Sequence, residues 1–229
     1  MNYGAGGALE GVDGSEPSTM RTAYRILPGG NRPGSRNLFP VTVRPTRADV
    51  AIAHAIARDT APAPEEVARA LTWGADEKVL LLLATAGWIA TRGSGERLQR
   101  AANHALLVAV AASLLPHGLK LLFDQTRPDR RTVLGHVHGV SFSGKRKDAF
   151  PSGHALHMGA LASAASALPA GPRRTLQTLA VGLSLTRVVV LAHWASDVVA
   201  GFALGAILER LLRHWTGYPA VKENDHADS

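Results

Sequence analysis

The chain has 229 residues, enough for one functional unit with a core of its own and too few for two large domains. It contains no cysteine, which excludes a disulfide framework, a thiolate zinc site and a cysteine nucleophile. The formal charge is +7, and 46% of the residues are hydrophobic, a fraction that suits either a soluble core or a few short membrane spans.

The N-terminal residues 1–46 are rich in Gly, Pro, Ser and Arg and show no apolar periodicity. This composition predicts a disordered or loosely ordered tail. From Thr46 onward, apolar residues recur at helical spacing until Pro62 and Pro64 interrupt them, and the pattern resumes over residues 65–73. The sequence therefore predicts an amphipathic hairpin or a pair of interfacial helices after the tail.

Five apolar segments follow, and each is a candidate membrane span: residues 79–91, 101–118, 154–170, 175–192 and 197–212. They are rich in Ala and Leu and do not alternate with polar residues, which predicts helices rather than strands. The predicted fold class is all-α, a multi-pass transmembrane helical bundle of about five spans with an amphipathic N-terminal helical region. A polar C-terminal tail is expected at residues 217–229.

Positive charge is concentrated between residues 119 and 150, where seven basic side chains stand against three acidic ones. Lysine and arginine bind phosphate oxygens, so this stretch implies an anionic partner. Arginines also mark the connectors on the opposite predicted face, so the two faces carry nearly equal positive charge. The positive-inside rule therefore does not orient the chain.

The first polar cluster consists of Lys120, Arg127 and Pro128, at the end of an apolar segment. Residues seven apart lie on one helix face, so both cations are predicted to converge on one anion before the proline ends the helix. The alternative is a pair of cations that snorkel at the edge of a membrane segment.

The second cluster, Pro151, Ser152, Gly153 and His154, opens the next apolar segment on the same predicted face. Serine is a good N-cap and glycine lets the backbone approach a ligand, so the free N–H groups at this helix start are predicted to hold phosphate oxygens. The alternative is an ordinary capped helix with an incidental histidine.

The third cluster consists of Arg187, His193 and Asp197. A histidine and an aspartate at i and i+4 share a helix face, which predicts that the carboxylate accepts one imidazole N–H and leaves the other ring nitrogen free to attack. The alternative is a polar pair that satisfies itself between helices.

Together, Lys120-x6-Arg127-Pro128, the Pro-Ser-Gly-His run at 151–154 and Arg187-x5-His193-x3-Asp197 closely resemble the signature of the type 2 phosphatidic acid phosphatase and haloperoxidase superfamily. The apolar segments around the match resemble the membrane branch of that family. Thr186 stands where the family usually has Ser, and it keeps the hydroxyl. The family commonly shows one more span, which leaves the topology of residues 1–77 open.

The resemblance implies a membrane phosphatase domain over residues 47–216 that hydrolyses a lipid or isoprenoid phosphate or pyrophosphate without a metal or another cofactor. His193 would attack phosphorus to form a phosphohistidine, and Asp197 would orient and charge its ring. His154 would protonate the leaving oxygen and then activate water. The phosphoryl oxygens would be bound by Lys120, Arg127, Ser152, the Gly153 N–H and Arg187.

The same residues are compatible with two other functions: a vanadium-dependent haloperoxidase, and a non-catalytic membrane protein that binds anionic lipid.

Residues 139–145 resemble a phosphate-binding P-loop, but Arg146 stands where a magnesium-binding Ser or Thr is needed. His136 and His138 lack a third metal ligand at a recognisable spacing.

The expected partners are the phosphorylated lipid substrate and membrane lipids, with no nucleic acid. Candidate substrates include phosphatidic acid, phosphatidylglycerol phosphate and undecaprenyl pyrophosphate. The family's habit puts the pocket on the outer or periplasmic face of the cell membrane. The sequence carries no information on oligomeric state.

Overall fold

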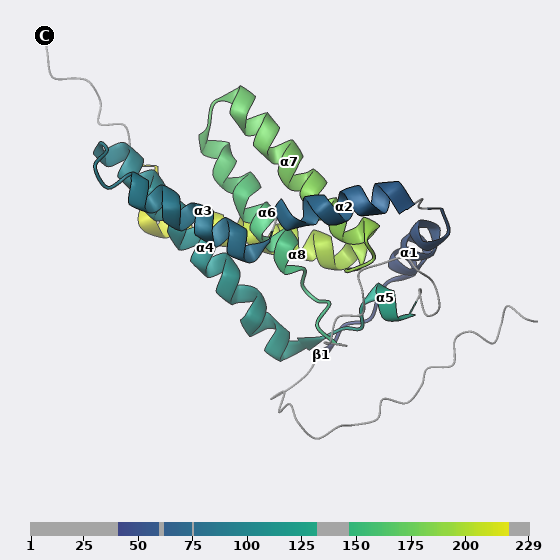
Figure 1. Ribbon diagram of the computed structural model, residues 1–229. Coiled ribbons are helices and arrows are strands. Elements are labelled where there is room, and N and C mark those ends of the chain that lie inside the picture. The colour runs from purple at the N-terminus through teal and green to yellow at the C-terminus, as the bar shows by residue number, and fades with distance from the viewer. Residues whose placement is uncertain (1–40, 60–61, 75, 132–146, 220–229) are drawn as a thin grey trace, which may run out of the picture. The chain divides into compact units, whose positions relative to one another are not determined.

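Helices dominate the part of the chain that the computed structural model describes, which comprises residues 41–59, 62–74, 76–131 and 147–219 (Figure 1). The helices are, in chain order, α1 (Arg47–Asp59), α2 (Pro62–Gly74), α3 (Glu77–Ala90), α4 (Glu96–Leu122), α5 (Pro128–Arg131), α6 (Gly153–Ala164), α7 (Ala170–Val189) and α8 (Ala195–Thr216). Two strands of two residues each, β1 (Val41–Thr42) and β2 (Phe123–Asp124), pair in parallel. The described chain is helical as predicted, except for this strand pair, which the all-α prediction did not include.

The predicted segments correspond to helices in the expected order. The five apolar segments form α3, α4, α6, α7 and α8, and the amphipathic region forms α1 and α2. The predicted tail was too long at its C-terminal end, because β1 already pairs with β2 and the Val43 N–H donates to the Asp124 carbonyl (2.9 Å). Residues 1–40 and 220–229, which hold the rest of the two predicted tails, lie outside the described residues.

The buried helix α6 packs most closely against α8, and glycines make the approach possible. A Cβ at Gly205 would lie 1.8 Å from the Leu156 carbonyl oxygen, and one at Gly159 would lie 1.9 Å from the Phe202 carbonyl oxygen. No other residue type fits at such distances, so the two backbones are in direct contact. α6 also packs on α4 and α7. This packing places the start of α6 beside the start of α8, where the second and third polar clusters lie.

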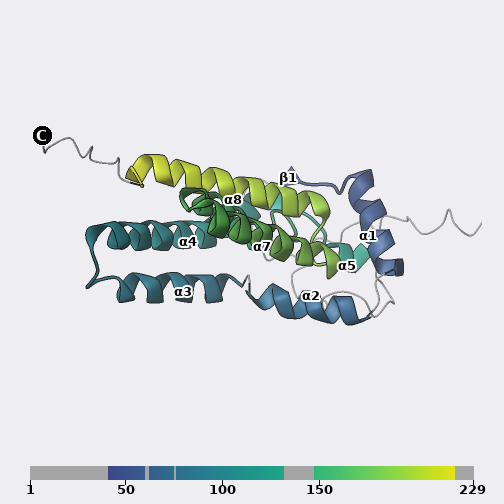
Figure 2. The ribbon, with the colours of Figure 1, turned by 90° about the horizontal axis from the view of Figure 1, so that it is seen from above.

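One helix among those described, α4, is long and apolar enough to cross a membrane by length and composition. Only 22% of its apolar stretch is buried inside the bundle. α7 and α8 are long enough but carry charged residues near both ends, whereas α3 and α6 have 14 and 12 residues. Figure 2 shows α3 beside α4, with α2 continuing the line of α3 along α7. The predicted count of about five spans therefore stays a prediction.

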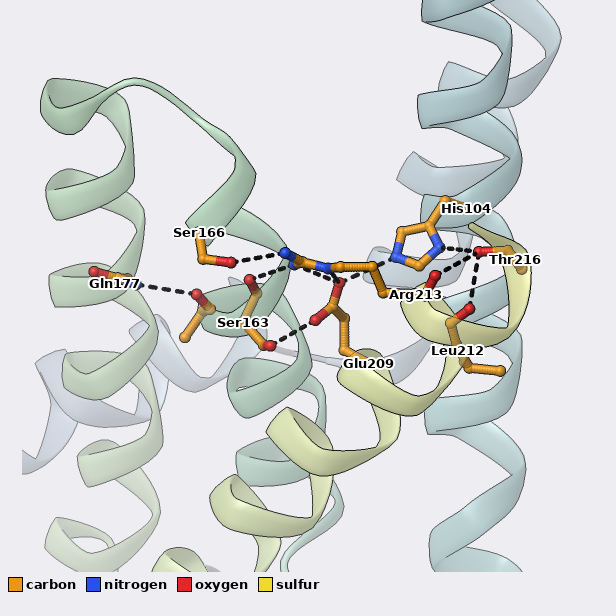
Figure 3. A network of polar contacts seen from close by, with 9 residues as sticks. His104, Ser163, Ser166, Gln177, Glu209, Leu212, Arg213 and Thr216 are labelled. Atoms are coloured by element: carbon orange, nitrogen blue, oxygen red, sulfur yellow. Dashed lines mark hydrogen bonds and ion pairs between the residues drawn. The ribbon is translucent and has the colours of Figure 1, made fainter. Parts of the chain in front are cut away.

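A fully buried carboxylate, Glu209 of α8, joins three helices near the C-terminal end of that helix (Figure 3). It accepts hydrogen bonds from Ser163 Oγ of α6 (2.5 Å) and from Arg213 Nε (2.9 Å) and Nη2 (2.6 Å), and it lies 3.1 Å from His104 Nε2 of α4. Arg213 Nη2 also donates to the Ser163 carbonyl (2.7 Å). The network therefore links α4, α6 and α8 through one negative charge.

Glu209→Ala is expected to destabilise the fold by about 3–5 kcal/mol, because it removes the buried carboxylate that the His104 ring and the Arg213 guanidinium share. The measurement is the thermal unfolding midpoint of the detergent-solubilised protein. Glu96→Ala is the matched control, since Glu96 is an exposed acid of α4 whose ion pair with Arg100 faces solvent. It is expected to change stability by less than about 1 kcal/mol. Equal midpoints for the two variants would contradict a stabilising role for the network.

Candidate active site

The three polar clusters of the sequence meet at one end of the bundle. Arg127 Nη1 donates to the Ala192 carbonyl (3.2 Å), which joins the first cluster to the third. The Ser152 N–H donates to the Asp197 carbonyl (3.2 Å), which joins the second cluster to the third. The predicted convergence of residues far apart in the sequence is therefore present in the structure.

His193 lies in the loop between α7 and α8, with its ring buried and held by the backbone. Nδ1 is 2.7 Å from the Ala149 carbonyl oxygen, and because a carbonyl only accepts, Nδ1 carries the proton. Burial, with the charges of Arg127 and Arg187, holds the pKa of His193 well below its usual 6.5. The ring is therefore neutral at pH 7, and its Nε2 has a free lone pair for nucleophilic attack.

Asp197 does not make the hydrogen bond that the sequence predicted. Its Oδ2 lies 3.8 Å from His193 Nδ1, beyond hydrogen-bond distance, and the Ala149 carbonyl takes the N–H instead. Asp197 Oδ2 accepts from the Trp194 N–H (3.0 Å), because Asp197 is in the first turn of α8 and satisfies the backbone at the start of the helix. Its Oδ1 is buried with no hydrogen-bond partner in the described chain. Asp197 is thus a buried carboxylate beside the imidazole rather than its direct acceptor.

One carboxylate, Asp148, holds the two cations of the first cluster. Asp148 Oδ1 accepts from Arg127 Nε (2.9 Å), and Asp148 Oδ2 lies 3.9 Å from Lys120 Nζ. Arg127 is buried, so this ion pair fixes its guanidinium beside the His193 loop. The sequence prediction missed Asp148, which stands at no recognisable motif spacing.

Arg187, near the end of α7, presents an unsatisfied buried donor. Its Nε is buried and has no hydrogen-bond partner among the described residues. Its carbonyl accepts from the Ala192 and His193 N–H groups (3.1 and 3.2 Å), so its backbone also shapes the loop that carries His193. A buried cationic N–H without an acceptor is costly, and an anion bound beside it would supply the acceptor.

Thr186, where the family usually has Ser, uses its hydroxyl to connect two helices. Its Oγ1 donates to the Leu183 carbonyl (2.6 Å) and lies 3.0 Å from the Thr72 Oγ1 of α2. The hydroxyl therefore anchors α2 to the end of α7, next to Arg187.

The second cluster begins α6 as predicted. Ser152 is the N-cap, is fully buried, and accepts from the Ala155 N–H through its Oγ (3.4 Å). Gly153 is the first helical residue and His154 the second. His154 is within electrostatic range of Arg187 and of Lys120. The cluster thus brings a histidine and the amino end of a helix to the same cations.

Among the residues whose placement is described, no group of three or more His and carboxylate side chains is arranged to hold a metal ion. Two sequence observations, the P-loop-like run at 139–145 and the pair His136 and His138, lie outside the described residues.

Comparison with curated proteins finds similarity to two lipid A 1-phosphatases. The chain is 39% identical over 98 residues to the one from Rhizobium johnstonii and 38% identical over 97 residues to the one from Rhizobium etli. Each alignment covers 42% of this chain, but only 40% and 42% of the respective relative. The chain therefore matches well under half of the length of these relatives.

Two solved structures share the fold. A PAP2-type phosphatidylglycerolphosphate phosphatase from Bacillus subtilis aligns with a TM-score of 0.53 and 23% identity, over 74% of this chain and 85% of that protein. LpxE from Aquifex aeolicus aligns with a TM-score of 0.56 and 16% identity, over 76% of this chain and 99% of that protein. The model of the PAP2 superfamily matches residues 101–219, more than half of the chain, and these residues contain all three clusters. The chain belongs to the PAP2 superfamily.

Proposed function

We propose that this protein hydrolyses a lipid phosphate through a phosphohistidine intermediate on His193. One observation carries the proposal: the neutral imidazole of His193 has a lone pair on Nε2, and its backbone N–H donates to the carbonyl of Arg187, whose buried Nε lacks an acceptor among the described residues. A phosphoryl group fits both residues, because its oxygens accept hydrogen bonds from Arg187 and its phosphorus accepts the lone pair of His193 Nε2.

In the first step, His193 Nε2 attacks phosphorus in line and the bond from phosphorus to the lipid oxygen breaks. Lys120, Arg127 and Arg187 bind the phosphoryl oxygens together with Ser152 and the Gly153 N–H, and they neutralise the charge that spreads over these oxygens. His154, protonated in the complex with the anionic phosphate, gives its proton to the leaving oxygen, so the lipid departs as an alcohol.

The intermediate carries a proton on Nδ1 and phosphorus on Nε2, so its ring is positively charged. The Ala149 carbonyl accepts the hydrogen bond from Nδ1, and the Asp197 carboxylate, 3.8 Å from Nδ1, stabilises the positive charge of the ring. In the second step, neutral His154 takes a proton from water, the water oxygen attacks phosphorus, and the bond between Nε2 and phosphorus breaks. Phosphate leaves, and both histidines regain their starting protonation.

A lipid phosphate monoester is the substrate class that fits a membrane location. We propose that α3, α6, α7 and α8 cross the membrane with α4, which places the pocket at the membrane boundary on the outer or periplasmic face. The lipid chain then stays in hydrocarbon while its phosphate reaches the cations. Because the aligned relatives are lipid A 1-phosphatases, a lipid A 1-phosphate is the first candidate, before phosphatidic acid, phosphatidylglycerol phosphate and undecaprenyl pyrophosphate.

The test is phosphate release from this panel of lipids by the detergent-solubilised protein in excess chelator. We expect turnover that the chelator does not reduce and that orthovanadate, a phosphate mimic, inhibits. Loss of turnover in chelator would show that the metal-free mechanism is wrong. Absence of phosphate release together with bromide oxidation in vanadate and peroxide would instead indicate a haloperoxidase.

A further inference from the structure

A single buried carboxylate, Asp49, caps two helices that are far apart in the sequence. Asp49 lies in the first turn of α1, where its Oδ2 accepts from the Thr46 N–H and the Thr46 hydroxyl (both 2.8 Å). The same carboxylate accepts from Ser196, with Oδ1 bound to its N–H and Oδ2 to its hydroxyl (both 2.8 Å). Ser196 is the second residue of α8, so Asp49 satisfies a free N–H group at the start of that helix.

Asp49 is charged at neutral pH despite its burial. Burial raises the pKa of its carboxyl, but the hydrogen bonds from Ser196 and Thr46 together lower that pKa to below its usual 3.8. Asp49 is only 3% exposed and also lies within electrostatic range of Asp197. A capping residue of an ordinary surface helix would face water, so the burial of Asp49 marks a contact between α1 and α8 in addition to the local cap.

The apolar face of α1 packs on the loop that carries His193. Ala53 of α1 is buried in one cluster with Leu191 and Trp194, which flank the histidine loop on its two sides. Leu191 has φ of +52°, a left-handed conformation that a leucine rarely adopts. The surrounding packing must hold such a residue in place, and α1 supplies part of that packing.

The same apolar cluster holds the acceptor of the histidine hydrogen bond. Ala149, whose carbonyl binds His193 Nδ1, is fully buried in the cluster with Ala53, Leu191 and Trp194. Its N–H donates to the Gln125 carbonyl (3.1 Å). Helix α1 thus packs against both the loop that carries the imidazole and the residue that orients it.

We propose that α1 is a positioning element for the nucleophile and that Asp49 is the positioning residue that anchors it to α8. The inference rests on the proposed function, because it concerns the direction in which His193 Nε2 points toward phosphorus. Asp49 touches neither substrate nor phosphorus. It acts through Ser196 and the first turn of α8, which follows His193 by two residues.

The test is Asp49→Ala in the full-length protein, assayed on the best lipid phosphate of the panel above. We expect kcat to fall by about 10-fold to 100-fold, because a small misplacement of a nucleophile is costly, while KM stays within about threefold of the wild-type value. The inhibition constant of orthophosphate should also be unchanged, because its binding depends on the cations. Asp59→Ala is the matched control, since Asp59 is an exposed acid at the other end of α1 that pairs with Arg58, and it should retain the wild-type kcat.

If Asp49→Ala does not fold, Ser196→Ala serves as the second test variant. It removes one hydrogen bond to Asp49 and keeps the hydrogen bond from the backbone N–H at position 196. We expect it to lower kcat by about 3-fold to 10-fold. A folded Asp49→Ala or Ser196→Ala protein with the wild-type kcat overturns the inference and leaves the proposed function standing. A lower kcat together with a higher KM and weaker orthophosphate binding indicates a general distortion of the site and also overturns the inference. A wild-type protein that releases no phosphate from any lipid overturns both.

Discussion

His193→Ala is expected to lower phosphate release by about 10⁴-fold or more, because it removes the proposed nucleophile. Its Nδ1 donates to the Ala149 carbonyl, and burial, with the charges of Arg127 and Arg187, keeps the imidazole neutral. Only its Nε2 remains for the reaction. The measurement is kcat for phosphate release from a lipid phosphate, with bound orthophosphate as a check that the cation site persists.

His214→Ala is the matched control for this experiment. His214 is an exposed histidine in the last turn of α8, far along the helix from the pocket, and its loss should leave kcat unchanged. Turnover in His193→Ala within about tenfold of the wild-type value would exclude His193 as the nucleophile. It would support a non-catalytic lipid-binding role or a different catalytic group.

Arg187→Ala is expected to cost about 10³-fold in kcat, because it removes a preorganised charge from the phosphoryl oxygens as the transition state forms. Arg187→Lys keeps the charge but loses the planar donor pair, so we expect an intermediate value. Arg210→Ala, which removes an exposed arginine of α8, is the control and should match the wild type. A wild-type kcat in Arg187→Ala would show that Arg187 does not stabilise the transition state.

The pH dependence of the residual activity gives a second readout for Arg187. Burial is the main cause of the lowered pKa of His193, and the charges of Arg127 and Arg187 lower it further. A histidine nucleophile is lost as pH falls through its folded-state pKa, since the protonated ring cannot attack. Removing Arg187 raises that pKa toward 6.5, so the acidic limb of the kcat/KM profile should move to higher pH in Arg187→Ala. An unchanged acidic limb would mean that the charge of Arg187 does not lower the pKa of His193.

The three motifs were readable from the sequence because each depends on local spacing. Ser152 is an N-cap, as a short run of residues allows one to predict. The prediction that Lys120 and Arg127 lie on one helix face was wrong, because α4 ends at Leu122 and Arg127 lies in the loop before α5. The apolar segments also predicted the helices α3, α4, α6, α7 and α8, since helical periodicity is a local property. The convergence of the motifs followed from their common position at segment ends.

The contacts that fix the geometry of the pocket were not predictable in this way. Asp49 and Ser196 are separated by 147 positions, and Arg127 and Asp148 by 21, with no motif that relates them. The acceptor of the His193 N–H is a backbone carbonyl, which every residue carries and no sequence pattern marks. The i and i+4 spacing of His193 and Asp197 suggested a direct hydrogen bond, but a helix begins between them and draws the carboxylate to its own backbone. Such pairings are decided by tertiary packing.

The central claim is that His193 becomes covalently bonded to phosphorus during turnover. The most direct measurement is a rapid acid-free quench of the enzyme with a lipid labelled at its phosphate, followed by mapping of the label on the protein. We predict an alkali-stable, acid-labile phosphoryl group on His193, present in the wild type and absent from His193→Ala. Phosphate release by the wild type with no labelled protein at any quench time, or with label on another residue, would contradict the account.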